Sequence, residues 1–426
     1  MTDSETPGHG PGCTEFRTSR RRLLQGVSAM AGGLAFDAAT GGVFRQVAFA
    51  ATGTATNVLV VLSLRGGVDG LSLVVPHGDP AYRQARPTIA VPAATLLAAD
   101  SMFGLHPGFK PLLSMWQDGR FGAVQAVGLP QPNRSHFAAM EEMEDADLGS
   151  PSRRGWLNRM IGLDSSSNPL EAVHLGSATV PTTLYGSAPV VAANRINQLK
   201  LAGTGNREAR IRKERSLHRV WDRAGGPLGR SARSALRTVN RVEDLATTTA
   251  RPANGASYPK GDLGSSLADT ARLLRADLGV ETVTLDYGNW DMHVNLGTLE
   301  GGAMTKMVTE LAQALAAFFV DLGSLGSRVT VVTVSEFGRR VQENGNRGLD
   351  HGYGNVMLML GAGVNGGQVH GSWPGLGSGR LIDGDLAVTR DYRSVLTEVL
   401  RARFPAVDTS RVFPAFSPES IGVMRG

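Results

Sequence analysis

Cysteine is almost absent from this chain of 426 residues, and aromatic side chains make up only 6% of it. The single cysteine, Cys13, lies in an N-terminal segment that we expect to be removed. The mature protein would then have no disulfide bond, no thiolate metal site and no cysteine nucleophile. The few aromatic residues do not alternate with basic ones. The sequence therefore does not indicate a nucleic-acid partner, although the net charge is +5 and the isoelectric point is about 9.6.

Long apolar runs are also missing. Beyond the N-terminal segment, no stretch reaches the ~18 apolar residues of a membrane-spanning helix, so we expect no transmembrane segment in the mature chain. Glycine, in contrast, is abundant at 54 residues, and 42% of the residues are hydrophobic. This length and composition indicate a loop-rich α/β protein with one large domain or with two.

The N-terminus carries an export pattern. The segment Ser19–Gln25 (SRRRLLQ) has paired arginines before two leucines, and a weakly apolar stretch, Gly26–Phe36, follows it. Ala48–Ala50 then offers a cleavage site with small residues. We therefore predict that residues 1–51 are a twin-arginine signal peptide. The export machinery would be a partner, and the protein would act in the periplasm or outside the cell. The alternative is an ordinary basic, amphipathic N-terminus.

Apolar strand patterns alternate with helical patterns along the rest of the chain. Extended segments are expected at Asn57–Ser63, Leu71–Pro76, Arg120–Val127, Glu281–Tyr287, Val329–Val334 and Asn355–Leu360. Helices are expected at Leu105–Asp118, Ser135–Asp145, Leu263–Leu278, Met304–Leu322 and Arg393–Arg403. This alternation predicts an α/β fold: a mostly parallel sheet with helices on both faces.

Residues 52–426 would form this α/β domain, with an Arg-rich, largely helical insertion at about residues 151–262. Its most basic part, Arg207–Asp244, also contains acidic residues. Two interpretations stay open for this part, a solvated helical face or a contact with an anionic surface.

Polar residues of the metal-binding type follow three of the predicted strands. Asp69 follows the first strand, and Asp291 and His293 follow the strand at Glu281–Tyr287. Glu336 stands at the end of Val329–Val334, with Asp350 and His351 in the loop beyond. The carboxyl ends of parallel strands meet at one edge of a sheet, so these side chains can converge. A mixed set of Asp, Glu and His suits one or two divalent ions of Zn, Mn, Mg or Ca.

Ser135 follows the strand at Arg120–Val127 and opens a helix. The free N–H groups and dipole of a helix N-terminus favour an anion such as phosphate or sulfate. A hydroxyl beside metal ions can attack such an ester, because the metal lowers its pKa and stabilises the developing charge.

Each of these residues also has a structural interpretation. Asp69, Asp291 with His293, and Asp350 with His351 could be turn or loop residues. Glu336 could pair with Arg339 or Arg340, and Ser135 could simply cap its helix.

At these residues the chain resembles a family of twin-arginine-exported bacterial proteins, domain-of-unknown-function family 1501. The matching segments are LRGGVDGLSLVVP (Leu64–Pro76), NRSHFAAME (Asn133–Glu141), NWDMH (Asn289–His293), SEFGRR (Ser335–Arg340), GLDHGYGNVMLMLGAGVNGG (Gly348–Gly367) and DYRSVLTEVL (Asp391–Leu400). The resemblance covers nearly all of the mature chain. The family looks like a branch of the alkaline phosphatase and sulfatase superfamily, whose members use one or two metals around a hydroxyl or formylglycine nucleophile.

The resemblance implies a role for individual positions. Asp69 stands where the superfamily has its first-strand metal carboxylate, and Ser135 lies near the nucleophile position. Asp291 and His293 fall at the Asp-and-His metal motif, Glu336 at the later strand-end Asp, and His351 at the final ligand His. Two positions depart from the pattern. Asn295 stands four residues after Asp291 and Phe337 follows Glu336, where the superfamily often has histidines, so a single metal or oxygen-rich sites are implied.

We therefore expect an exported, metal-dependent hydrolase of a phosphate or sulfate ester, with a small anionic ester as its substrate. Ser135 would attack or bind the ester, and Arg65, Arg134 and His136 would bind its anionic group. The expected metal ligands are Asp69, Asp291, His293, Glu336, Asp350 and His351. Two alternatives remain: a non-catalytic protein that binds a ligand or a cell-wall component on the same scaffold, and an assembly factor for another exported protein.

Overall fold

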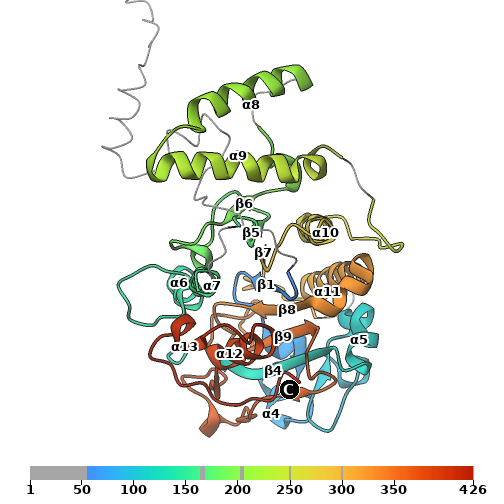
Figure 1. Cartoon of the computed structure of the whole chain (residues 1–426). Coiled ribbons are helices and arrows are strands. Elements are labelled where there is room, and N and C mark those ends of the chain that lie inside the picture. Colours follow the sequence, from blue (N-terminus) through green and yellow to red (C-terminus); the bar gives the residue numbers. More distant parts are fainter. Residues whose placement is uncertain (1–54, 164–167, 202–205, 249–250, 299–300, 426) are drawn as a thin grey trace, which may run out of the picture.

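The structure is a computed structural model that describes residues 55–163, 168–201, 206–248, 251–298 and 301–425 (Figure 1). The predicted signal peptide, residues 1–51, lies outside the described residues. A nine-stranded sheet runs through the body in the order β10-β4-β9-β8-β1-β7-β5-β6, with β11 also paired to β4. Its strands are β1 (Val58–Leu64), β4 (Phe121–Gly128), β5 (Ala172–Leu175), β6 (Val191–Ala193), β7 (Thr282–Tyr287), β8 (Val329–Val334), β9 (Asn355–Gly361), β10 (Val369–His370) and β11 (Arg390–Asp391).

Most neighbouring strands of this sheet run parallel. β1 pairs in parallel with both β7 and β8, with Leu62 opposite Leu285 and Val60 opposite Val331. β9 is antiparallel to β8 and to β4. The predicted mostly parallel sheet is therefore confirmed, and the carboxyl ends of β1, β4, β7 and β8 lie at one edge.

The residues of β1 show why this chain forms a central strand. All seven residues of β1 are buried. Val60 and Leu62 pack into the hydrophobic core on one face of the sheet, and Leu59 and Val61 pack into the core on the other. Burying a side chain of this kind stabilises the fold by about 1.5–3 kcal/mol. A continuous apolar run is thus what a strand covered on both faces requires.

Helices cover both faces of the sheet, as expected. On one face lie α5 (Leu113–Gln117), α10 (Asp262–Arg275) and α11 (Ala303–Leu322), and on the other lie α6 (His136–Asp145), α7 (Trp156–Ile161), α12 (Tyr392–Arg403) and α13 (Thr409–Val412). The remaining helices and short strands of the body are α3 (Gly70–Leu73), α4 (Pro80–Ala85), β2 (Val74–Val75) and β3 (Gly104–Leu105). Short 3-10 helices occur at η1 (Ala93–Thr95), η2 (Pro107–Leu112), η3 (Thr182–Leu184), η4 (Ile196–Gln198), η5 (Gly323–Arg328) and η6 (Ser378–Arg380).

One stretch among the described residues, Ala303–Arg328, is long and apolar enough to cross a membrane by length and composition alone. It contains α11, whose residues Leu311, Leu315 and Phe318 are buried in the core against the sheet. We therefore interpret α11 as a core helix.

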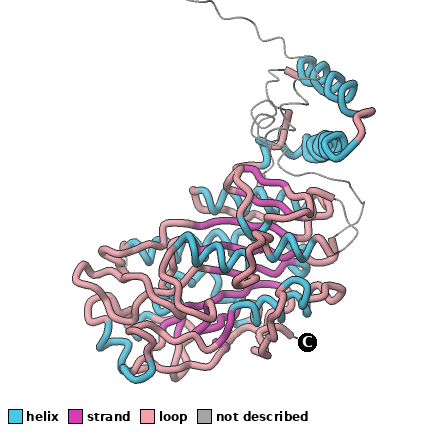
Figure 2. Tube along the Cα trace, turned by 90° about the vertical axis from the view of Figure 1, so that its left-hand side faces the viewer, coloured by secondary structure: helices cyan, strands magenta, loops and turns pink. Residues whose placement is uncertain are grey.

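Two helices form an arm that stands out from the body in both ribbon views (Figures 1 and 2). They are α8 (Arg207–Trp221) and α9 (Gly226–Thr247). Val242 and Ala246 of α9 join the main core, which fixes the arm to the body.

The structure corrects three local expectations. Leu71–Leu73 belong to α3, and only Val74 and Val75 of the expected extended segment form a strand. The helix expected at Leu105–Asp118 is divided into η2 and α5, because Pro111 inside it has no N–H to continue an α-helix. Residues 151–262 are not helical throughout, since β5 and β6 lie in this range and extend the central sheet beyond β7.

Candidate metal centre

Loops after four strands of the sheet bring polar side chains together at one edge. The loop after β1 contributes Gly66, and His136 is the first residue of α6 after β4. The loop after β7 contributes Asp291 and His293. The long loop after β8 contributes the rest of the cluster: Glu336, Arg339, Asp350 and His351. This is the edge at which open α/β sheets place their ligands.

Three histidines turn the same ring nitrogen toward one carboxylate oxygen. Oδ1 of Asp291 lies 2.9 Å from Nε2 of His293, 3.3 Å from Nε2 of His351 and 3.5 Å from Nε2 of His136. The Nε2 atoms of His293 and His351 are 3.1 Å apart. Ligands about 2.0–2.1 Å from a tetrahedral zinc ion are ~3.3 Å from one another. The observed separations are therefore close to those of a metal-ligand set.

The other ring nitrogen of each histidine is held by an acceptor. Nδ1 of His136 lies 2.8 Å from Oε1 of Glu336, and Nδ1 of His293 lies 3.0 Å from Oδ1 of Asp350. Nδ1 of His351 lies 2.9 Å from the backbone carbonyl of Arg134. Carboxylates and carbonyls only accept hydrogen bonds, so each Nδ1 is the donor. This arrangement leaves each Nε2 to face the cluster, as in metal sites with an oriented histidine.

His136 supplies a further sign that the cluster suits a metal ion. Its Nε2 is buried and forms no hydrogen bond with any described residue, since Asp291 at 3.5 Å is too far for a well-aligned one. An unpaired buried nitrogen is costly unless something binds it. The donor atoms of His136, Asp291 and His351 all lie within 4.8 Å of one another, and His293 is an additional donor beside Asp291 and His351. A set this rich in imidazole nitrogen suits Zn better than Mg or Ca.

Arg339 lies beneath Asp291 and is almost completely buried, with 1% of its side chain exposed. Its Nη2 donates to Oδ1 of Asp291 at 2.6 Å, and other guanidinium atoms donate to the carbonyls of Gly67 and Leu349. Partial burial alone would raise the pKa of Asp291, but the hydrogen bond and charge of Arg339 outweigh it and lower that pKa. Asp291 is therefore held ionised. The hydrogen bond from His293 is also the largest cause of the lowered pKa of Asp350.

Glu336 positions His136 rather than facing the other donors directly. Its buried carboxylate accepts from the N–H of Gly66 at 2.8 Å and from the hydroxyl of Ser335 at 3.2 Å, in addition to His136. Gly66 has a φ of +111°, and a Cβ atom there would lie 2.7 Å from the backbone nitrogen of Asp291. Only glycine fits where the loop after β1 approaches the loop after β7 so closely. The N–H of Gly66, which donates to Glu336, is therefore held beside the Asp291 loop.

Asp69, which was expected to bind metal, lies elsewhere in a buried ion pair. Both of its oxygens accept from the guanidinium of Arg86, at 2.6 and 2.9 Å, and one also accepts from Ser72. This bidentate pairing occupies the carboxylate, so Asp69 is not among the ligands we assign. Arg86 is fully buried and 17 residues away in the chain, and no sequence pattern indicated the pairing.

The two arginines expected to bind an anion are each paired with carboxylates. Arg65 is 2.6 Å from Glu144 and 2.8 Å from Asp286, and Arg134 is paired with the buried Asp385. Burial raises the pKa of Asp385, and Arg134 opposes this effect. Arg65 remains on the wall of a groove beside the cluster, whereas Arg134 contributes its carbonyl to His351.

Ser135 is exposed at the N-cap position of α6, but its side chain forms no capping hydrogen bond. Ser135 thus holds the expected N-cap position, and its hydroxyl is not used to cap the helix. The pairing of Glu336 with Arg339 or Arg340 is not found either, because Arg339 binds Asp291 and Arg340 lies 4.0 Å from Asp385.

An open groove with a volume of about 570 Å³ begins at the cluster. His136, Asp291 and Glu336 of the cluster line it, and Arg65, Met140 and Tyr185 are among its other lining residues. Phe137 also lines it, although 91% of this side chain is exposed. A ligand larger than a phosphate ion could therefore reach His136 and Asp291.

Two functional features were missed in the sequence. His136 was expected to bind substrate, yet it offers the unpaired nitrogen of the cluster. Its place at the start of a helix after a parallel strand was a usable signal. No sequence pattern indicated the role of Arg339, because its partner Asp291 lies 48 residues earlier and in another loop.

Solved structures similar to this chain include hydrolases and a periplasmic domain. The C-terminal periplasmic domain of EptC from Escherichia coli, in complex with Zn, is 10% identical, with a TM-score of 0.36, covering 88% of this chain and 92% of that one. A sulfatase, PsFucS1 from Pseudoalteromonas sp., is 8% identical, with a TM-score of 0.34, covering 93% and 74%. An alkaline phosphatase from the Antarctic bacterium TAB5 is 10% identical, with a TM-score of 0.29, covering 74% and 95%.

At TM-scores below 0.5, these similarities do not bear on the site. No curated protein matches the chain. A family model does match, over residues 102–396, and it includes all of the cluster except the Gly66 loop. The chain thus belongs to the family described as "Protein of unknown function (DUF1501)".

Proposed function

We propose that this protein is a metal-dependent hydrolase of phosphate or sulfate esters. The observation that carries the proposal is the convergence of three Nε2 atoms on Asp291 while each Nδ1 is fixed by an acceptor. His136, Asp291 and His351 would hold one divalent ion, with His293 as a further ligand, and Zn fits this donor set best. Glu336 and Asp350 would orient His136 and His293 and would not bind the ion themselves.

The residues around the cluster have separate tasks in this proposal. A bound metal ion would supply Lewis acidity toward an ester oxygen and would make water or a hydroxyl a better nucleophile at neutral pH. Arg339 keeps Asp291 ionised and in place. Ser135 carries an exposed hydroxyl directly before His136 and is the candidate nucleophile on the chain. Arg65 on the groove wall is the candidate anion-binding group.

The charged residues that line the groove support the proposal that binding of an anionic substrate depends on the metal ion. Four carboxylates line it, from Glu141, Glu144, Asp291 and Glu336, against two guanidinium groups, from Arg65 and Arg153. Arg339 offsets the charge of Asp291 from outside the groove, and the smaller surplus of negative charge that is left would still repel an anionic ester. A divalent cation at the cluster would compensate for it, so binding of metal and ester should be coupled.

One observation favours the alternative, a non-catalytic ligand-binding protein. Arg339 already neutralises Asp291 at 2.6 Å, so the cluster is partly charge-compensated without an ion. In that case the groove would bind a neutral or cationic group and would have no hydrolytic activity. The third possibility, an assembly factor for another exported protein, has no specific support among the described residues.

We also propose that the protein is exported by the twin-arginine pathway and acts in the periplasm or outside the cell. The support is the SRRRLLQ segment at Ser19–Gln25 and the small residues before Ala51.

The test is a set of hydrolysis assays on the purified protein with 4-nitrophenyl phosphate and 4-nitrophenyl sulfate. Metal-free protein should be inactive, and Zn should restore turnover of one of the two esters. Asp291→Asn should abolish that turnover, whereas Asp383→Asn, an equal change of charge outside the cluster, should not. Ser135→Ala separates two routes: loss of activity supports a serine nucleophile, and retained activity supports water. No activity with either ester after addition of Zn, Mn, Mg and Ca favours the ligand-binding alternative.

A further inference from the structure

One face of helix α8 packs on α9, the second helix of the arm. Leu217 packs against Leu236 and Val239 of α9. Glu214 accepts a hydrogen bond from Asn240 at 2.8 Å, and Arg210 is paired with Glu243. The residues at 210, 214, 217 and 221 follow helical spacing, so they form one face that is committed to α9.

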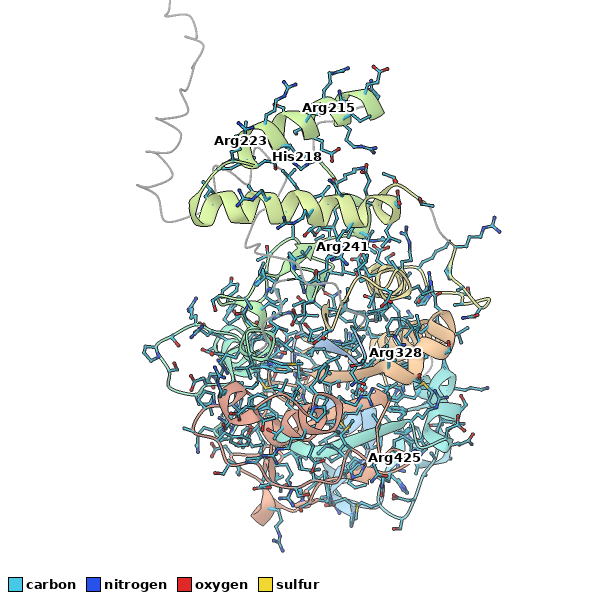
Figure 3. The ribbon with its side chains drawn as sticks, viewed as in Figure 1. Arg215, His218, Arg223, Arg241, Arg328 and Arg425 are labelled. Carbon is cyan, nitrogen blue, oxygen red and sulfur yellow. The ribbon has the colours of Figure 1, made fainter. Side chains whose placement is uncertain are left out.

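The opposite face of α8 is a row of arginines. Arg212, Arg215 and Arg219 are three and four residues apart and so lie on the same side of the helix, and Arg223 continues the row just after it. All four are exposed, Arg212 by 69% of its side chain. Figure 3 shows Arg215 and Arg223 on the arm, at the end of the molecule away from the C-terminal strands and helices. We call these four residues the α8 arginine row.

Little within the protein compensates the charge of this row. Arg212 lies 3.6 Å from Glu208, an exposed pair one turn away. The nearby Asp222 is bound by His218 at 3.0 Å. In the described part of the chain, the side chains of Arg215, Arg219 and Arg223 form no ion pair and no hydrogen bond. Like charges at this spacing repel one another, so the row is unfavourable for the isolated helix and is available to an external anion.

The position of the row on the arm favours a flat anionic surface over a nucleic-acid strand as its partner. The row belongs to α8, which is the outer helix of the projecting pair (Figure 1). A nucleic-acid strand is usually held in a basic groove lined by aromatic rings. Among the described residues, α8 offers no aromatic ring beside the row, because its one aromatic residue, Trp221, is buried. A flat anionic surface, in contrast, can approach the outer helix of a projecting arm without obstruction. The apolar face of α8 is already packed on α9, so such a contact would be electrostatic and would not insert the helix.

We propose that the α8 arginine row docks the protein on a membrane surface rich in anionic phospholipid. The contact leaves the metal cluster free, because that cluster lies at the sheet edge and the row lies on the arm. It does not depend on the proposed hydrolase activity.

The experiment is co-sedimentation of the full chain with vesicles of phosphatidylcholine alone or with about one third phosphatidylglycerol. The test variant carries Arg212→Gln, Arg215→Gln, Arg219→Gln and Arg223→Gln. The control variant has the same net charge and carries Arg83→Gln, Arg380→Gln, Arg401→Gln and Arg411→Gln, at exposed positions on other elements. Circular dichroism checks that both variants keep their helices.

We expect the wild type and the control to bind the anionic vesicles in low salt, and to be released as salt is raised. The test variant should bind on the order of 10²–10³-fold more weakly, because each basic residue near such a surface contributes roughly five-fold in affinity. Equal binding by the two variants, or binding to neutral vesicles, would overturn the proposal. So would retention on heparin without binding to vesicles, which would indicate a soluble polyanion as the partner.

Discussion

Glu336 and His136 are 200 residues apart in the chain, yet Oε1 of Glu336 lies 2.8 Å from Nδ1 of His136. This contact determines which nitrogen of His136 faces the cluster. The same oxygen accepts from the N–H of Gly66 at 2.8 Å, so the carboxylate is fixed before any metal binds. The site is therefore preorganised, which reduces the cost of ordering its ligands.

Glu336→Gln tests this relationship. The substitution keeps the size of the side chain but removes the charge that orients His136. We expect it to weaken Zn binding by about 10–100-fold, the usual effect of losing such a partner, measured by competition with a chromogenic chelator. Glu398→Gln is the matched control, because Glu398 also binds backbone N–H groups, at Ile421 and Val423, but away from the cluster. Equal Zn affinity in wild type and Glu336→Gln would contradict the positioning role.

Asp69→Asn separates a structural role from metal binding. It leaves the fully buried guanidinium of Arg86 without its counter-charge, so we expect a loss of about 3–5 kcal/mol in the free energy of unfolding, measured with denaturant. The double variant Asp69→Leu with Arg86→Met removes both charges and should lose less. Zn affinity should be unchanged in both. A large loss of Zn affinity in folded Asp69→Asn would restore Asp69 as a ligand.

His106 predicts an acid-sensitive step in stability. Its Nδ1 accepts from the N–H of Gly108 at 3.0 Å, and burial lowers the pKa of His106 from 6.5 to about 4. The unfolded chain therefore binds a proton near pH 6.5 that the folded protein does not bind until about pH 4. The contribution of His106 is fully present above pH 6.5 and is lost as the pH falls toward 4, by at most about 3 kcal/mol.

The measurement for His106 is the free energy of unfolding between pH 7 and pH 4 for wild type and His106→Asn. Asparagine can accept the same N–H but does not titrate in this range. The variant should lose less stability than the wild type over this interval. Parallel pH curves for the two proteins would contradict the assignment to His106.

Phosphate binding should require the metal. Isothermal titration of inorganic phosphate into metal-free protein should show no binding, because carboxylates outnumber guanidinium groups in the groove. The Zn-loaded protein should bind phosphate, and Arg65→Gln should weaken this binding by roughly 10-fold, the effect of losing one charged hydrogen bond. Phosphate binding of the same strength with and without Zn would show that the cluster is not part of the anion site.

The sequence predicted the general fold because the alternation of apolar strand patterns and helical patterns can be recognised locally along the chain. The apolar runs at Asn57–Ser63 and Val329–Val334 predicted strands buried on both faces, and the carboxyl ends of parallel strands share an edge. This was enough to bring Asp291, His293, Glu336, Asp350 and His351 into one region. The antiparallel direction of β9 and the pairing of β5 and β6 with the central sheet were not predictable, because strand partners are set by tertiary packing.

The detailed division of roles within the site could not be predicted. Asp69 and Asp291 look alike in sequence, each an acidic residue in a loop after an apolar strand. Arg86 pairs with the first and Arg339 with the second, and both pairings depend on distant loops meeting in the fold. Only the three-dimensional arrangement distinguishes a buried structural carboxylate from one that faces three histidines.

The most direct test of the account is the metal content of the purified protein after incubation with Zn and removal of free metal, measured by inductively coupled plasma mass spectrometry. We expect about one tightly bound ion per chain. His136→Ala and His351→Ala should each remove most of it while the protein stays folded, and His174→Ala, a histidine buried elsewhere in the sheet, should not. Wild-type protein without bound metal, or full metal content in folded His136→Ala and His351→Ala, would contradict the claim that these histidines form a metal centre.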